Sequence, residues 1–234
     1  MLTEKCRLLL LEQGEETQVE IHTSFIGGIP HIPSDYELPI CHLCGEQQTF
    51  YFQVAFPDSH LWAGRTMALF SCTSCAHKDY LIPEMLSGEL TGADIPAGFL
   101  ETYQKNFRIL IYKTSSGTKR DDYKEKIKYK KINLVENADQ YIDANKIGGC
   151  PNWILDDEAP ATYNKDLDMF FLMQILEGAT FEIVPGAPSQ IVLGLSGEPE
   201  ASNSGYYELF LGNNVYFFGT ESKENKSVYI ITQI

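Results

Sequence analysis

Four of the six cysteines occur as two C-x-x-C pairs, a pattern typical of metal sites. Cys41 and Cys44 form the first pair, and Cys72 and Cys75 form the second, with 27 residues between the pairs. Four thiolates complete the tetrahedral shell of Zn²⁺ and leave no position for water. The spacing therefore predicts a structural Zn²⁺ site. An iron centre, a redox pair of thiols and ordinary buried cysteines stay open as alternatives.

The histidines argue against a catalytic metal. A zinc deaminase needs H-x-E upstream of P-C-x-x-C, but none of the five histidines is followed two places later by Glu. The chain also has no G-x-S-x-G, no H-E-x-x-H and no phosphate-binding glycine loop. Cys6 and Cys150 have no partner at a recognisable spacing, so we expect ordinary thiols there. We therefore expect a protein that is not an enzyme; an enzyme or small-ligand binder with its site between two halves of the chain is the alternative.

Two apolar segments lie between the cysteine pairs and must bring them together. The segments are QTFYFQVAF (48–56) and RTMALFSC (65–72), and both are typical of strands. An antiparallel hairpin of these strands would return the second cysteine pair to the first. Gly45, directly after the first pair, suits the tight turn of such a site. We therefore expect a hairpin like that of a zinc ribbon in the first half of the chain.

Part of the sequence occurs twice, at an offset of 121 residues. Residues 25–54 align with residues 146–175 without a gap and agree at nine positions, which include the Gly, Gly and Pro of one turn. These residue types fix the shape of the backbone, so we interpret the pattern as an internal duplication. The expected layout is a single domain (1–234) with repeats at about 17–118 and 132–234, joined by a lysine-rich segment (119–131).

Each copy consists of a Gly-Gly-x-Pro turn, an irregular acidic loop and an apolar strand that contains one glutamine, Gln53 or Gln174. A buried amide needs hydrogen-bond partners at both ends, and the backbone near the Gly-Gly turn can supply them. In the second copy Thr162 and Lys165 replace the first cysteine pair. That loop cannot bind a metal in the same way, and we expect packing around Trp153 to hold it.

The remaining pattern is rich in strands and poor in helices, which predicts an α+β fold that is predominantly β. Two β-rich halves would pack as one pseudo-symmetric unit. We expect helices or helical turns at 2–12, 97–105 and 136–145. Besides the hairpin, we expect strands at 17–23, 106–113, 168–176, 179–185, 190–195, 205–211, 214–219 and 227–233.

The charge excludes a general nucleic-acid binder. The net charge is −14, from 18 basic and 32 acidic residues, whereas a surface that neutralises phosphates needs a basic excess. The charge suits solubility or a cationic partner. Residues 119–131 are the exception, with 7 basic and 3 acidic residues. Their alternating lysines favour an edge strand, and a basic contact patch is the alternative.

The only leucine run near the start of the chain, Leu8–Leu11, is too short for a secretory signal or a membrane-spanning helix. We therefore expect a cytoplasmic protein without a membrane partner, in which cysteines stay reduced or bind metal.

The two copies, FIGGIPHIPSDYELPICHLCGEQQTFYFQV and KIGGCPNWILDDEAPATYNKDLDMFFLMQI, resemble the duplicated core of the YwqG-like family, bacterial proteins without a settled function. Residues 38–75 are also similar to the zinc-hook segment of the programmed-cell-death-protein-two family, eukaryotic chaperones of a ribosomal protein. Neither resemblance supplies catalytic residues.

The resemblances imply a non-catalytic protein-binding module with a structural zinc. YwqG-like domains are associated with toxin–immunity loci, which makes an immunity protein that neutralises a basic toxin one candidate. An acidic inhibitor would associate rapidly with such a partner. A chaperone of a basic ribosomal protein is the alternative that the shorter resemblance implies.

Overall fold

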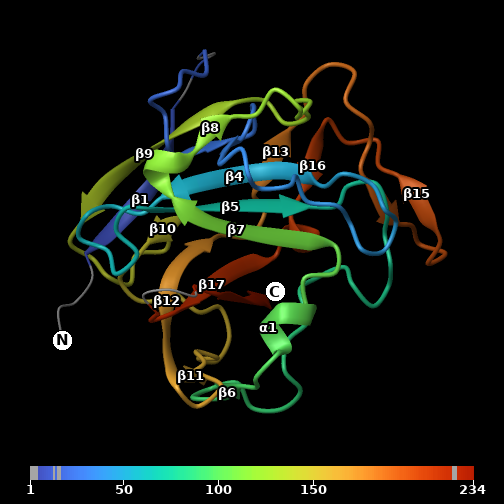
Figure 1. The fold of residues 1–234 in the computed structure, drawn as a ribbon. Helices are drawn as coiled ribbons and strands as arrows, with labels where there is room; N and C mark the ends of the chain where they lie inside the picture. The colour runs from blue at the N-terminus through green and yellow to red at the C-terminus, as the bar shows by residue number, and fades with distance from the viewer. Residues whose placement is uncertain (1–4, 13, 15–16, 223–225) are drawn as a thin grey trace.

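The computed structural model describes residues 5–12, 14, 17–222 and 226–234. Strands make up 38% of the structure and helices 4%, which confirms a predominantly β protein (Figure 1). The one α-helical turn in this part of the chain is α1 (Phe99–Thr102), within the region 97–105 where a turn was expected. Two short 3₁₀ turns are η1 (Thr114–Ser116) and η2 (Phe210–Gly212).

Ten strands form one continuous antiparallel path, which gives the molecule a single large sheet. In spatial order they are β18 (Val228–Gln233), β17 (Asn214–Thr220), β12 (Leu167–Ile175), β10 (Lys146–Ile147), β1 (Cys6–Leu11), β9 (Lys130–Asn137), β2 (Phe25–Ile26), β4 (Thr49–Ala55), β5 (Arg65–Ser71) and β7 (Phe107–Lys113).

The remaining strands are short. The strand β11 (Thr162–Tyr163) pairs with β12 and, in parallel, with β6 (Asp94–Ile95), so the sheet is mixed. Three separate pairs are β3 (His31–Ile32) with β8 (Thr118–Lys119), β13 (Thr180–Glu182) with β16 (Tyr206–Glu208), and β14 (Ile191–Leu193) with β15 (Pro199–Ala201).

On both sides of the sheet's centre, neighbouring strands follow one another in the order in which they occur along the chain. From β9 the path runs β2, β4, β5, β7, and from β1 it runs β10, β12, β17, β18. Phe25 pairs with Gln53 in the first series, and Lys146 pairs with Gln174 in the second, which are positions 121 residues apart. The first strand β1 lies between β9 and β10 and therefore adjoins the second series. That a duplication produced this arrangement stays a prediction.

The two Gly-Gly turns have equivalent geometry. Gly27 and Gly148 both have positive φ angles, of 57° and 65°. The N–H of Gly27 donates to Tyr51 O, and that of Gly148 donates to Leu172 O, both at 2.9 Å. A Cβ on Gly27 would lie 2.4 Å from the carbonyl oxygen of Lys128, so this turn requires glycine for space as well as for φ.

The buried glutamines brace both turns as the sequence predicts. Gln53 Oε1 accepts from His31 N at 2.9 Å, and Gln53 Nε2 donates to Thr23 O at 3.1 Å. Gln174 Oε1 accepts from Asn152 N at 2.9 Å, and Gln174 Nε2 donates to Ala144 O at 3.0 Å. Each amide therefore ties together the chain before and after a Gly-Gly turn.

The main core extends over both halves of the sheet and includes Phe52, Trp62, Met173 and Phe217. A second cluster, around Phe25, lies in the first half only. Burial on both faces explains why β4, β17 and β18 are apolar almost throughout, although β18 lies at the end of the path.

Four local predictions are wrong. Residues 6–11 form β1 rather than a helix, residues 136–145 contain the end of β9 followed by turns, and residues 17–23 contain no strand. The lysine-rich segment supplies β9, which is bordered by β1 and β2 and is not an edge strand. For β1 and β9, pairing with distant strands on both sides outweighed the local pattern. Residues 2–4 of the expected first helix lie outside the described residues.

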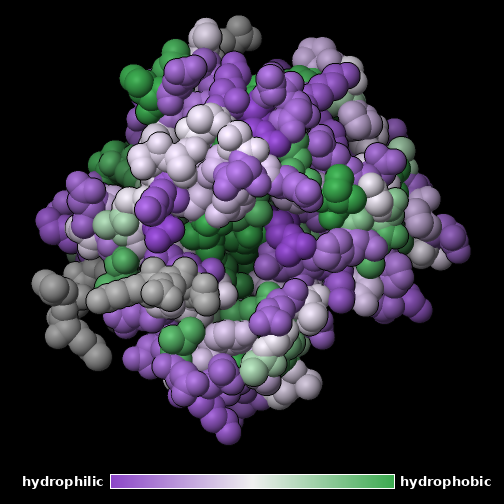
Figure 2. Space-filling model, in the orientation of Figure 1, coloured by the Kyte–Doolittle hydropathy of each residue, from purple (hydrophilic) through white to green (hydrophobic). Residues whose placement is uncertain are grey.

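The surface in Figure 2 is largely hydrophilic, with a green recess between the positions of β7 and β17. A hollow of about 460 Å³ is lined in part by Arg65 of β5, Ile111 of β7, Leu167 of β12 and Lys226, which precedes β18. In the described part of the chain, no helix is long and apolar enough to cross a membrane.

Candidate metal centre

The pairing of β4 with β5 positions the four cysteines. Thr49 pairs with Ser71 at one end of this hairpin, so Cys72 follows directly after the last paired residue. Cys41 and Cys44 lie in the loop before β4. Gly45, with a φ of 79°, donates its N–H to Cys41 O at 2.9 Å and closes the tight turn around the first pair. The hairpin predicted from the sequence therefore brings the pairs together.

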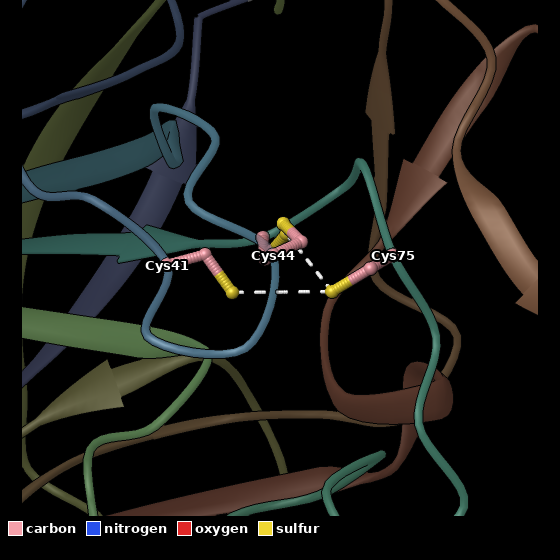
Figure 3. A group of neighbouring side chains, drawn as sticks. Cys41, Cys44 and Cys75 are labelled. Atoms are coloured by element: carbon pink, nitrogen blue, oxygen red, sulfur yellow. Dashed lines mark hydrogen bonds between the residues drawn. The ribbon is translucent and has the colours of Figure 1, made fainter.

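The four sulfur atoms form a compact group, all within 4.8 Å of one another. The Sγ–Sγ distances are 3.9 Å for Cys41–Cys75 and 3.6 Å for both Cys44–Cys72 and Cys72–Cys75. Figure 3 shows the sulfurs of Cys41 and Cys75 directed toward each other from separate segments. A tetrahedral ion with metal–sulfur bonds of about 2.3 Å requires sulfurs about 3.8 Å apart. The group is therefore suited to bind one metal ion.

Burial controls the protonation of these thiols. Burial raises the pKa of Cys72 to about 12 and also raises the pKa of Cys75. Burial opposes ionisation of Cys44 as well, but hydrogen bonds from the Glu46 backbone and the neighbouring thiols outweigh it and lower the pKa of Cys44. Two thiols of the group are thus protonated at neutral pH without a cation, and a bound metal would have to displace their protons.

Polar groups around the sulfurs favour negative charge there. Ser74 N donates to Cys72 Sγ at 3.4 Å. The half-buried Lys126 lies nearby, and its Nζ donates to Gln47 O and Thr49 Oγ1, both at 3.3 Å. Burial lowers the pKa of Lys126, and the Cys72 and Glu46 side chains oppose that shift. A divalent ion with four thiolates carries a net charge of −2, which this lysine would partly offset.

The second half of the chain holds the equivalent loop without sulfur. Thr162 Oγ1 and Lys165 N both donate to Asp94 Oδ1 at 2.6 Å. Trp153 packs against Tyr216 and Phe218, with ring centroids 4.4 and 5.9 Å away. Packing around Trp153 was expected from the sequence, whereas the carboxylate of Asp94 was not, because it comes from a distant segment.

Cys6 and Cys150 lie outside the four-sulfur group, as expected, and near the buried Lys146. Lys146 has no exposed surface, and its Nζ donates to Gln140 O at 3.0 Å and to Ile142 O at 2.9 Å. The sequence comparison of the two copies aligns Lys146 with Phe25, and that mismatch was the one available signal of this buried charge. Burial lowers the pKa of Lys146.

No protein-family model matches the chain, and no curated protein matches it either. Among the residues that the structure describes, the four cysteines are the one group of three or more Cys, His, Asp or Glu side chains placed to hold a metal. The geometry of the chain itself therefore carries the functional argument.

Proposed function

We propose that the chain is a non-catalytic protein-binding module, that its four cysteines hold a structural Zn²⁺, and that its partner is a basic protein. The proposed binding role rests on the loop of residues 153–158, which is held by hydrogen bonds and exposes apolar and acidic side chains together. We call this segment the Trp153 loop.

The Trp153 loop is held from beneath by a side chain of the last strand. Gln233, which is 3% exposed, accepts from Ile154 N at 3.2 Å and from Leu155 N at 3.1 Å. Its Nε2 donates to Asp156 O at 3.0 Å and to Glu158 Oε2 at 2.9 Å. A loop that is already ordered loses less conformational entropy when it binds a partner.

The exposed side of the same loop has the composition of a protein contact. Ile154 and Leu155 are 45% and 62% exposed, and Asp156 and Asp157 beside them are also exposed. Residues 147–234 contain 12 acidic and 3 basic residues, a net charge of −9. A basic partner would be attracted to this half and could then bury the two apolar side chains.

The four-sulfur geometry supports the zinc proposal, since an all-thiolate shell is typical of structural Zn²⁺ sites. The β4–β5 hairpin that carries the cysteines supports a zinc-ribbon-like unit. The repeated turns, glutamine contacts and strand order support an internal duplication of the YwqG-like kind. Within that family a toxin is the partner we favour, and such an immunity role would be exercised in the cytoplasm.

The test is to isolate the partner from the native host and measure its association with the purified chain at two salt concentrations. We expect a basic protein in a 1:1 complex, with an association rate that falls as salt increases. Leu155→Ser and Asp157→Lys should each weaken binding by at least about tenfold, the effect of about 1.4 kcal/mol.

Matched controls are available on the β14–β15 turn. Leu195 is fully exposed and Glu198 lies nearby on the surface, so Leu195→Ser and Glu198→Lys make the same chemical changes elsewhere. Equal losses in both pairs of variants, or a partner that is not basic, would contradict the proposal. A bound ribosomal protein would favour the chaperone role over the toxin inhibitor.

A further inference from the structure

An apolar hollow of about 330 Å³ lies on one face of the sheet, where its two halves meet. Its lining residues come from β1, β2, β4, β9 and β12, from Asn145 before β10, and from residues 179–181 at the start of β13. The volume falls within the range of small-molecule binding sites. The hollow is distinct from the metal centre and from the Trp153 loop, because no residue of either lines it.

The two halves of the sheet contribute matching apolar residues to the walls. Phe52 and Met173 line the hollow, as do Val54 and Ile175, and both pairs are 121 positions apart. Four apolar side chains thus line the hollow from β4 and β12. Phe52, Val54 and Met173 are at most 1% exposed and Ile175 is 8% exposed, so the favourable contribution is the removal of the ligand's own apolar surface from water, about 25 cal/mol per Å².

The polar groups at the hollow are hydrogen-bond donors or can act as donors. They are Lys130, Asn145 and Thr180, and none of the described residues that line the hollow is acidic, although the chain carries a net charge of −14. Asn145 Oδ1 accepts from Leu176 N at 2.7 Å. Within the described part of the chain Asn145 Nδ2 has no partner, and this amide is free to donate to a ligand.

Lys130 is available to an anion because its present ion pair is weak. Lys130 Nζ lies 3.8 Å from Glu182 Oε2, whereas the other carboxylate oxygen of Glu182 is bonded directly to Lys128. The Lys130 side chain is 39% exposed. Lys128 would keep Glu182 paired if Lys130 turned toward a bound anionic group.

We propose that this hollow binds a hydrocarbon monocarboxylate, with the chain of the ligand against the β4 and β12 side chains and its carboxylate at Lys130. Asn145 Nδ2 is a second donor to the carboxylate. The hydrocarbon chain of such a ligand suits the apolar walls of the hollow. Its single negative charge suits a lining that contains one cation, Lys130, and no acidic residue among those described. This inference goes beyond the protein-binding proposal and does not depend on it.

The experiment uses octanoate and its neutral analogue 1-octanol as probes. The whole chain is labelled with ¹³C-methyl methionine, which gives few signals because the chain has five methionines. Met173 lines the hollow and Met85 does not. We expect the Met173 methyl signal to shift in a saturable way with both probes, while the Met85 signal stays unchanged. Failure of Met173 to titrate with octanoate overturns the proposal.

Three variants separate the contribution of the Lys130 charge from that of the apolar space. Lys130→Met should weaken octanoate binding by about tenfold and leave 1-octanol within twofold, whereas Lys131→Met, on the other side of the same strand, should change neither. Ala179→Trp, at the edge of the hollow, should abolish binding of both probes and keep the dispersed methyl spectrum of a folded chain. Equal loss of both probes in Lys130→Met, or full binding by Ala179→Trp, overturns the proposal.

Discussion

Replacement of one buried cysteine of the four-sulfur group tests the proposed zinc centre most directly. In Cys72→Ser a hydroxyl replaces the thiol at the residue that follows β5. Cys72 is 7% exposed, and its sulfur lies 3.6 Å from the sulfurs of both Cys44 and Cys75. The substitution therefore leaves three ligands in place and removes one that has little access to water. We expect loss of stably bound Zn²⁺ with little change in the rest of the fold.

The expected magnitude follows from the number of ligands. Structural Zn²⁺ sites in small domains contribute about 10–16 kcal/mol at neutral pH. An equal share for each of four thiolates is about 2.5–4 kcal/mol, which corresponds to a loss of affinity of about 10²- to 10³-fold. The main core extends over both halves of the sheet and does not depend on the cysteines, so global unfolding is not expected.

Metal content and chelator competition measure this effect. The unmodified chain should contain one Zn²⁺ and resist a chelator that strips Cys72→Ser. Hydrogen exchange should accelerate at the amides of Cys41 and Gly45, whose N–H groups close the turn around the first pair. Cys6→Ser is the control, because Cys6 is buried outside the group and its loss should leave metal content unchanged.

The reasoning fails if Cys72→Ser keeps one metal ion per chain with an affinity within about tenfold of the unmodified protein, since about 1.4 kcal/mol is far below one ligand's share. It also fails if Cys6→Ser loses the metal to the same extent. Iron in place of zinc in the purified protein would preserve the site and correct the identity of the ion.

Two further predictions concern stability. Gln174→Met should lower the free energy of unfolding by about 2–4 kcal/mol, because Asn152 N–H and Ala144 C=O both lose a buried partner. Urea denaturation measures this change. A decrease below about 0.5 kcal/mol would contradict the role of Gln174 in stabilising the turn. Burial, with smaller contributions from nearby cations, lowers the pKa of His60 to about 3, so the neutral form stabilises the fold above pH 6.5 and this stability is lost as the pH falls toward 3. Between pH 7 and pH 5 the unfolding free energy should therefore fall by about 2 kcal/mol less in His60→Asn than in the unmodified chain. This variant keeps an acceptor for the backbone N–H of Trp62. Urea denaturation at the two pH values measures the fall, and an equal fall in both proteins would refute the prediction.

Prediction from the sequence succeeded where a structural feature depends on local chemistry or on the spacing of residues alone. The two cysteine pairs were separated by two strand-like segments, and a hairpin was the simplest way to unite them. The structure has that hairpin, with Thr49 paired to Ser71 beside the cysteines. Gln53 and Gln174 were expected to be buried and bonded to the backbone because an amide within an apolar strand needs partners at both ends.

Prediction failed where a segment is paired on both sides by distant strands. The leucine run of β1 has no alternation that distinguishes a strand from a helix. Lys130 and Lys131 suggested an exposed edge, yet β9 lies between β1 and β2. Their side chains reach opposite sides of the strand, so that both remain partly exposed and the lysines do not prevent a central position.

The sequence by itself determined the predominantly β character, the grouping of four cysteines and the two equivalent Gly-Gly turns, because residue type and short-range spacing specify these features. Only the tertiary structure decided that β1 lies beside β10, that Asp94 holds the second loop, and that an apolar hollow with Lys130 at its edge lies where the halves meet. These features depend on contacts between segments far apart in the chain, and no local pattern encodes which distant partner provides the greatest burial and the best hydrogen bonds.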